Sequence, residues 1–399
     1  MNDRQPRRHV RRNVVMSFAA AAVYYLSNPH PQSYYDYTFR VAGSFLEGRT
    51  GLAELPPSWL NEFIPLGDRF YSAFPLGSVL TMLPFAALKA IGLIDSMPGA
   101  FIAALCAGIV CFLLLAISES YGLEPTRQIL LTSAMLFGTW LWVNLTFGGA
   151  WQLALGFAMI GELGAIYFSA VDRRPVLAGA FFALAFGNRT EVLLTAPIFM
   201  YLLSRNGREL RQAVRTNAAF SLVPVFLGLA TLFYNQARFD SFLDFGYARI
   251  PGVLAEPWYR DGIFSIYYIP GQAFEMLIKP WRVLSEFPYV VPDGFSSSIL
   301  ISSPFLFLLA RSGARDRVLK YTAWLAISLL TLLLWSHGNS GGWQFGYRYA
   351  IVLLPWALVI LLENSPKKIT VIEWAVYGFS IFANLYAVWL FHWTDHVKR

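Results

Sequence analysis

Charged residues are scarce in this sequence and are spread thinly over its whole length. They make up 14% of the 399 residues, whereas a soluble domain carries roughly 25%. A soluble enzyme with a single membrane anchor is therefore excluded. Cysteine is nearly absent, because only Cys106 and Cys111 occur and both lie inside one apolar run. This excludes a disulfide framework and a cysteine-based metal site, and it leaves the redox compartment open.

Familiar catalytic motifs and repeats are missing as well. The chain has no GxxxxGK[ST] loop for cradling phosphates, no HExxH motif, no GxSxG motif and no Cys/His metal spacing. It also lacks the alternating ten-residue segments of outer-membrane barrels. No inverted or tandem repeat of the apolar pattern is visible, which counts against a secondary transporter.

Apolar and aromatic residues dominate instead. The residues AVILMFWYC form 56% of the chain, and its mean hydropathy is +0.48. The 33 Phe, 20 Tyr and 13 Trp residues are far too many for a disordered chain. We therefore predict an all-α polytopic membrane protein that forms a single transmembrane domain over residues 1–399.

Apolar runs predict where the chain crosses the membrane. An arginine-rich N-terminus precedes the run 14–26, as in a secretory signal peptide, but SNPHPQ follows where a small-residue cleavage site would stand, so we interpret it as the first span. Further runs lie near residues 75–93, 98–118, 128–146, 150–170, 176–187, 191–204, 217–235, 297–310, 319–336, 349–362 and 371–391.

The net charge is +7, which in a membrane protein gives no reason to expect a nucleic-acid partner. The positions of the Lys and Arg residues along the chain instead decide among the possible topologies. If the run 75–93, with its two prolines and a lysine, re-enters the membrane or lies at its surface, the basic clusters share one side with the N-terminus. Because Lys and Arg collect in cytoplasmic loops, we predict about 11 transmembrane helices and a cytoplasmic N-terminus. The C-terminus and two long loops, 27–74 and 236–296, are then extracytoplasmic. Residues 176–204 form a helical hairpin whose turn, 187–191, faces the same side.

Polar residues gather in four clusters on that extracytoplasmic side, and such residues near a membrane usually serve function. The first is Tyr34-Tyr35-Asp36-Tyr37. A carboxylate among tyrosines is partly desolvated but can keep its charge, as a general base requires. The alternative is an aromatic-belt segment with one solvated acid.

The second cluster, residues 61–77, mixes charges of both signs with aromatic and turn residues. Its candidate substrate-binding residues are Glu62, Asp68, Arg69 and Tyr71. The alternative is an ordinary loop that lies on the membrane surface.

The third cluster is the hairpin turn that contains Arg189 and Glu191. Arginine binds phosphate through charge-assisted, often bidentate contacts, but a local ion pair between these two residues is an equally simple interpretation.

The fourth cluster, residues 335–349, has three glycines within five residues, which let a backbone approach a ligand closely. Its tryptophans and tyrosines offer stacking faces for sugar rings, and His337, Arg348 and Tyr349 are candidate binding residues. A lone histidine also commonly makes purely structural hydrogen bonds.

Two acids, Glu162 and Glu373, lie inside apolar runs. They could relay protons across the membrane, but two scattered acids are only a weak indication of a transporter.

With these residues in view, the chain resembles the lipid-linked glycosyltransferases of the GT-C superfamily, especially protein O-mannosyltransferases and lipid A aminoarabinose transferases. The resemblance is one of layout over most of the chain. An acid follows the first span, as Asp36 does. Residues 67–85, GDRFYSAFPLGSVLTMLPF, are similar to a frequent bacterial stretch of the form GxxYYSxxPPGxxLLxxPF. Arg189 matches a basic residue in an outward turn, and residues 341–349 match a GGxxFGxRY loop.

The resemblance implies a GT-C-like fold, an inner or plasma membrane location, and inverting transfer from a polyprenyl-phosphate sugar. Asp36 would deprotonate the acceptor, and Arg189 and Arg348 would stabilise the departing lipid phosphate. The acceptor, a glycan, a lipid or a protein, stays open. No cofactor is implied. A divalent metal is left open, because the second acidic residue common in the family is missing from the loop 144–152.

Two other functions fit the same features. A flippase or transporter of a lipid-linked glycan would use a similar basic pocket without chemistry, and its polar residues should trace a path through the bundle. A glycan polymerase or ligase also combines many spans with large outward loops. Because the polar residues gather on one side, the sequence favours an enzyme over a carrier. The identity of the acceptor would separate a polymerase or ligase from a single-sugar transferase.

Overall fold

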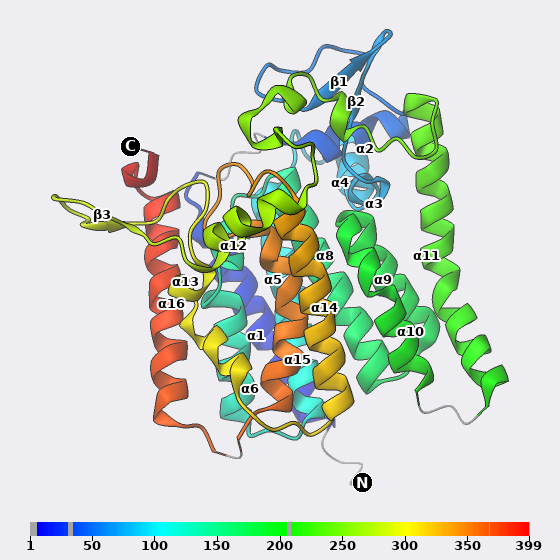
Figure 1. The fold of residues 1–399 in the computed structure, drawn as a ribbon. Coiled ribbons are helices and arrows are strands. Elements are labelled where there is room, and N and C mark those ends of the chain that lie inside the picture. The colour runs from blue at the N-terminus through cyan, green and yellow to red at the C-terminus, as the bar shows by residue number, and fades with distance from the viewer. Residues whose placement is uncertain (1–5, 31–34, 206–208, 367, 399) are drawn as a thin grey trace.

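The computed structural model describes residues 6–30, 35–205, 209–366 and 368–398; Tyr34 lies outside them. Within these residues the chain is a bundle of helices that run roughly parallel to one axis, with short helices and two small antiparallel sheets gathered at its upper end (Figure 1). The fold is thus that of an all-α membrane protein.

Long apolar helices form the body of the bundle. Among the described residues, five helices are long and apolar enough to cross a membrane. These are α5 (Gly99–Ser120), α8 (Ala150–Ile166) with its π-helical extension to Val171, α11 (Leu210–Phe239), α14 (Arg317–Ser336) and α16 (Val371–His392). Helix α1 (Pro6–Ser27) has a similar length. A 22-residue helix is about 33 Å long, which matches a hydrocarbon core of about 30 Å.

Other apolar runs, which the sequence predicts as simple spans, are interrupted. They form α6 (Pro125–Phe137), α7 (Leu141–Thr146), α9 (Pro175–Asn188), α10 (Ala196–Ser204), α13 (Ile299–Ser302) and α15 (Leu354–Glu363). Three of the interruptions are 3-10 segments, η2 (Thr190–Thr195), η7 (Pro304–Ala310) and η8 (Arg348–Leu353). Pro197, Pro304 and Pro355 stand at the start of a helical segment, where the missing proline N–H costs least.

The run 75–93 is also broken, into α3 (Leu76–Leu80) and α4 (Leu83–Ala90) near the upper end (Figure 1). Glycine lets α3 touch the end of α9, because a Cβ added at Gly77 would lie 2.4 Å from the carbonyl of Gly187. The Ser78 hydroxyl donates a 3.3 Å hydrogen bond to the carbonyl of Asn188. These contacts fix the position of the turn that follows α9.

The chain reverses at this turn, as the sequence predicts. The end of α9 meets α3 at the upper end, whereas Arg205, directly after α10, forms a 2.5 Å ion pair with Asp316 before α14 begins at the lower end (Figure 1). Arg189 therefore lies at the upper end of the bundle.

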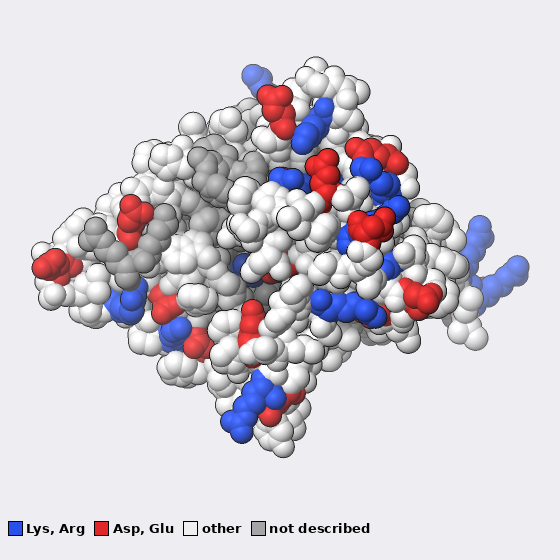
Figure 2. Space-filling view, turned by 90° about the horizontal axis from the view of Figure 1, so that it is seen from above, with Lys and Arg blue, Asp and Glu red and all other residues white. Residues whose placement is uncertain are grey.

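The two long loops cover the upper end. The first contains α2 (Tyr37–Leu46), β1 (Phe63–Leu66) and β2 (Arg69–Ser72), and the second contains α12 (Ile269–Leu277), β3 (Arg282–Val283) and β4 (Val290–Val291). Arg238 in the last turn of α11 joins α11 to the first loop, because its guanidinium donates to the carbonyl of Ser72. Seen from above, this face carries acidic and basic side chains interspersed (Figure 2).

The two acids within apolar runs hold helices together. Glu373 is buried and forms ion pairs with Arg127 of α6 and with Arg311, at 3.0 Å for the latter. It also completes the capping box at the start of α16 with Thr370. Glu162 in α8 accepts a 3.1 Å hydrogen bond from the indole of Trp356 in α15. These contacts give Glu373 a structural role at the lower end.

Candidate functional site

Three of the four sequence clusters meet around Trp151, in the first turn of α8 at the upper end of the bundle. The rings of Tyr35 and Tyr37 lie 4.8 and 5.1 Å from the Trp151 ring, centroid to centroid, and Phe74 lies 6.0 Å away. The guanidinium of Arg348 lies 5.7 Å from the same ring. Trp151 therefore joins the first long loop to the start of η8.

Glu62 is the carboxylate that this arrangement places beside the arginine. It accepts a 3.1 Å hydrogen bond from the indole N–H of Trp151, and its backbone N–H donates to the hydroxyl of Tyr37. Burial raises the pKa of Glu62 to about 7, against the opposing influence of the positive charge of Arg348 and the Trp151 hydrogen bond. Near neutral pH this carboxyl therefore exists in both protonation states.

Arg348 begins η8 and is buried although it forms no ion pair with any described residue. Its Nε has no hydrogen-bond partner, and its terminal nitrogen makes one 3.4 Å bond to the hydroxyl of Tyr349. Arg127, equally buried, is instead paired with Glu373. A buried charge without a direct ion-pair partner is costly, so Arg348 is suited to bind an anion.

Arg189 approaches Arg348 through a shared aromatic ring. Its guanidinium lies 4.9 Å from the ring centroid of Tyr349, and that of Arg348 lies 5.2 Å from it. Arg189 also forms a 2.7 Å ion pair with Glu191, so the local pair that the sequence allows is present. The two arginines thus differ, because Arg189 has a direct ion-pair partner and Arg348 has none among the described residues.

His337, the C-cap residue of α14, also contacts Tyr349. The two ring centroids are 6.0 Å apart, and the Nδ1 of His337 is 2.8 Å from the carbonyl oxygen of Asn339. Its Nε2 is 3.4 Å from the hydroxyl of Tyr259 in the second long loop. Burial lowers the pKa of His337, so the neutral ring predominates at neutral pH.

Asp36 lies beside this cluster and makes none of its contacts. It precedes α2, is buried, and its Oδ1 accepts a 2.7 Å hydrogen bond from the Nε of Arg40. No described residue makes a hydrogen bond or ion pair with its other oxygen. The rings of the adjacent Tyr35 and Tyr37 stack on each other and contact Trp151. Asp36 is therefore an oriented carboxylate with one unused oxygen.

The remaining candidates lie in the hairpin of β1 and β2, outside the cluster. Asp68 is exposed in the turn, 3.9 Å from Arg69, and Tyr71 packs 6.0 Å from the ring of Phe239 at the end of α11. No contact joins these three residues to Arg189 or Arg348. Their positions suit the outer rim of the site.

Sequence reasoning missed Trp151, Tyr247 and Tyr259. The hydroxyls of Tyr247 and Tyr259 are 2.7 Å apart, and both rings contact His337. A tryptophan in the short loop before a long apolar run was the only available indication for Trp151, because its partners lie about one hundred and two hundred residues away in the chain.

The described residues contain no group of three or more His, Cys, Asp or Glu side chains arranged to hold a metal ion. No family model matches the chain, and no curated protein and no solved structure is significantly similar to it.

Proposed function

We propose that this protein is a membrane glycosyltransferase with a GT-C-like fold that transfers a sugar from a polyprenyl-phosphate donor on the extracytoplasmic side of the inner or plasma membrane. The observation that carries the proposal is Arg348, a buried guanidinium without an ion-pair partner among the described residues. Its guanidinium lies over the rings of Trp151 and Tyr349, and a second arginine, Arg189, lies over the Tyr349 ring, at the end of an apolar bundle. A phosphate attached to a membrane-embedded lipid would pair directly with this guanidinium.

The reaction inverts the anomeric carbon. Asp36 accepts the proton of the acceptor hydroxyl, the acceptor oxygen bonds to the anomeric carbon, and the bond from that carbon to the phosphate oxygen breaks. The electron pair of that bond leaves with the lipid phosphate, which Arg348 and Arg189 stabilise. Attack and departure occur on opposite faces of the sugar, so a base outside the arginine cluster is consistent with inversion.

The donor assay tests this function directly. Purified protein in lipid nanodiscs would be incubated with a panel of polyprenyl-phosphate hexoses, pentoses and hexosamines and with extracted cell-envelope material, and release of polyprenyl phosphate measured. Transfer of sugar to an acceptor supports the proposal. In sealed vesicles, movement of intact donor between leaflets without cleavage would instead identify a carrier, and the absence of both would contradict a role in donor chemistry.

We expect eleven spans, with a cytoplasmic N-terminus and an extracytoplasmic C-terminus. The segments that carry the basic clusters of the sequence connect helices at the lower end of the bundle, and the long loops lie at its upper end (Figure 1). Reporter fusions after Arg215 and Arg317 should report the cytoplasm. Fusions near Ser58 and Gly262, and at the C-terminus, should report the opposite side. An outward reporter at Arg317 would contradict the arrangement.

Donor binding should weaken as pH rises from 6 to 8. Glu62 has a pKa of about 7 and lies near Arg348, so its ionisation places a negative charge beside the phosphate site. A phosphodiester keeps one negative charge throughout this range, and the repulsion should cost about 1 kcal/mol, roughly fivefold in Kd. Titration of protein in nanodiscs with a polyprenyl-phosphate sugar measures this. In Glu62→Gln the pH dependence should vanish; if it persists there, another group is responsible.

A further inference from the structure

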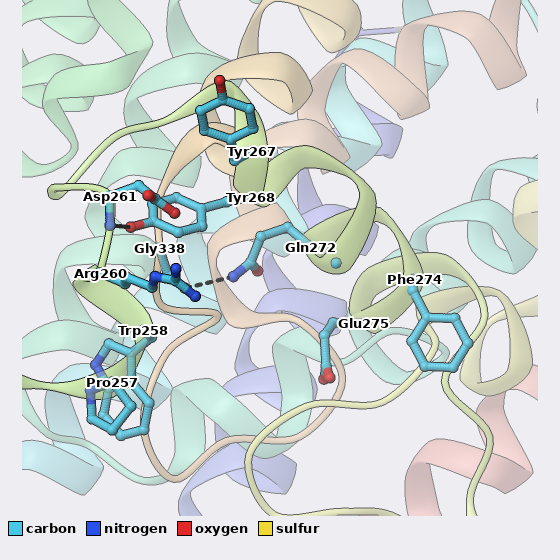
Figure 3. Close-up of a pocket in the computed structure, with 11 residues that line it drawn as sticks. Pro257, Trp258, Arg260, Asp261, Tyr267, Tyr268, Gln272, Phe274, Glu275 and Gly338 are labelled. Carbon is cyan, nitrogen blue, oxygen red and sulfur yellow. Dashed lines mark hydrogen bonds between the residues drawn. The ribbon is translucent and has the colours of Figure 1, made fainter.

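A second concave site lies on the upper face, in the second long loop, next to the candidate site. It is a cavity of about 430 Å³, within the range of small-molecule sites. Figure 3 shows Trp258 and Arg260 on one side and Gln272 and Glu275 on the other. Gly338, the neighbour of His337, also lines it.

We infer that this cavity, which we call the loop cavity, binds a neutral oligosaccharide and that this saccharide is the acceptor. The inference rests on the proposed glycosyl transfer and names the class of its acceptor, which the sequence leaves open.

The walls of the loop cavity are held in place by hydrogen bonds. The indole N–H of Trp258 donates to Glu256 at 2.6 Å, which fixes the orientation of the ring. The hydroxyl of Tyr268 donates to the carbonyl of Gly262 at 2.9 Å and accepts from the N–H of Asp261 at 2.7 Å. These aromatic side chains are therefore preorganised, and preorganisation lowers the entropic cost of binding.

The chemistry of the rim favours hydroxyl groups. Arg260 and Asp261 are exposed neighbours, and neither side chain forms a hydrogen bond or ion pair with a described residue. Arg260 supplies hydrogen-bond donors and Asp261 supplies acceptors. The hydroxyl groups of a sugar ring both donate and accept, so they can bond to both side chains. Trp258 remains 40% exposed, so its indole offers a surface for the apolar side of such a ring.

The charges argue against an anionic acceptor. Glu256, Asp261 and Glu275 contribute three negative charges around the cavity, and Arg260 and Lys279 contribute two positive ones. Lys279 is already paired with Glu275 at 2.9 Å. The surroundings are therefore slightly negative, which repels a phosphate- or uronate-rich polymer and accepts a neutral saccharide.

A short chain of contacts connects the loop cavity to the arginines. Gln272, buried in its floor, donates to the carbonyl of Gly338 at 2.9 Å and accepts a 2.8 Å hydrogen bond from the hydroxyl of Tyr347. Arg348 follows Tyr347 in the sequence, and His337 precedes Gly338 and contacts Tyr349. A saccharide in the cavity would lie one layer of aromatic side chains from the phosphate site.

A binding experiment on an array of neutral and anionic oligosaccharides tests the inference. Fluorescently labelled full-length protein in nanodiscs is applied to the array without donor, and the protein bound to each saccharide is measured. Neutral members should bind, and Trp258→Ala and Arg260→Ala should each weaken that binding at least tenfold. Phe295→Ala is the matched control, because Phe295 is similarly exposed but does not line the cavity, and it should bind as the unmodified chain does.

Three outcomes would overturn the inference: no neutral saccharide binds, only anionic ones bind, or the two cavity variants bind normally. Binding of a polyprenyl-phosphate sugar is measured on the same preparations. If the donor binds and saccharides do not, the acceptor assignment fails alone. If saccharides bind at the cavity and the donor is neither bound nor cleaved, the proposed transfer fails, and the cavity is a glycan site without the acceptor role.

Discussion

Asp36→Asn protein is expected to fold and to bind donor but to transfer sugar about 10²–10⁴-fold more slowly, the usual effect of losing a general base. The substitution keeps the size of the side chain and an oxygen that can accept from Arg40, but it removes basicity. Turnover of a polyprenyl-phosphate sugar by purified protein, measured beside donor affinity, separates the chemical step from binding.

Three further variants decide whether Asp36 acts on the acceptor or only anchors α2. Arg40→Gln breaks the same ion pair and should have a much smaller effect; an equal loss would favour a structural role for the pair. Glu62→Gln should mainly change the pH dependence of donor binding, and Asp68→Asn should be close to normal because Asp68 is exposed in a turn. A normal Asp36→Asn together with an inactive Glu62→Gln would move the base to Glu62.

The membrane class could be predicted from the sequence because it depends on local composition. Scarce charge over the whole chain, combined with runs of about twenty apolar residues, is characteristic of chains that cross a bilayer repeatedly. The positions at which these runs are interrupted were less predictable from the sequence. Proline at 304 or 355 allows a break, but whether the chain continues as α-helix or as a 3-10 segment depends on neighbouring helices.

The site was predicted in part for a similar reason. The sequence predicts Arg189, His337, Arg348 and Tyr349 on one side of the membrane, and in the structure the first three lie around the ring of Tyr349. Distance along the chain hid the contact of Glu62 with Trp151. Equally, sequence cannot show that Arg189 has an ion-pair partner and that Arg348 has none within the described part of the chain, because this depends on side-chain geometry.

That difference gives the last prediction. Arg348→Gln should lower the rate of transfer about 10²–10³-fold, by analogy with the removal of one preorganised oxyanion donor, and should weaken donor binding. Arg189→Gln should have a smaller effect, because Glu191 already offsets the charge of Arg189. Arg348→Gln should insert and fold, since Arg348 contributes no ion pair to the described part of the fold. Arg189→Gln should also fold, since it loses only the local pair with Glu191.

Polyprenyl-phosphate binding and transfer rates should be measured with Arg348→Lys and Arg282→Gln alongside. Lysine keeps the charge but loses the planar, bidentate geometry of the guanidinium, so this variant should fall between the unmodified chain and Arg348→Gln. Arg282 is exposed in β3 on the same face, and its loss should leave binding unchanged. If Arg348→Gln binds donor normally, or if Arg282→Gln weakens binding equally, the phosphate is held by general surface charge and Arg348 has no specific role in binding it.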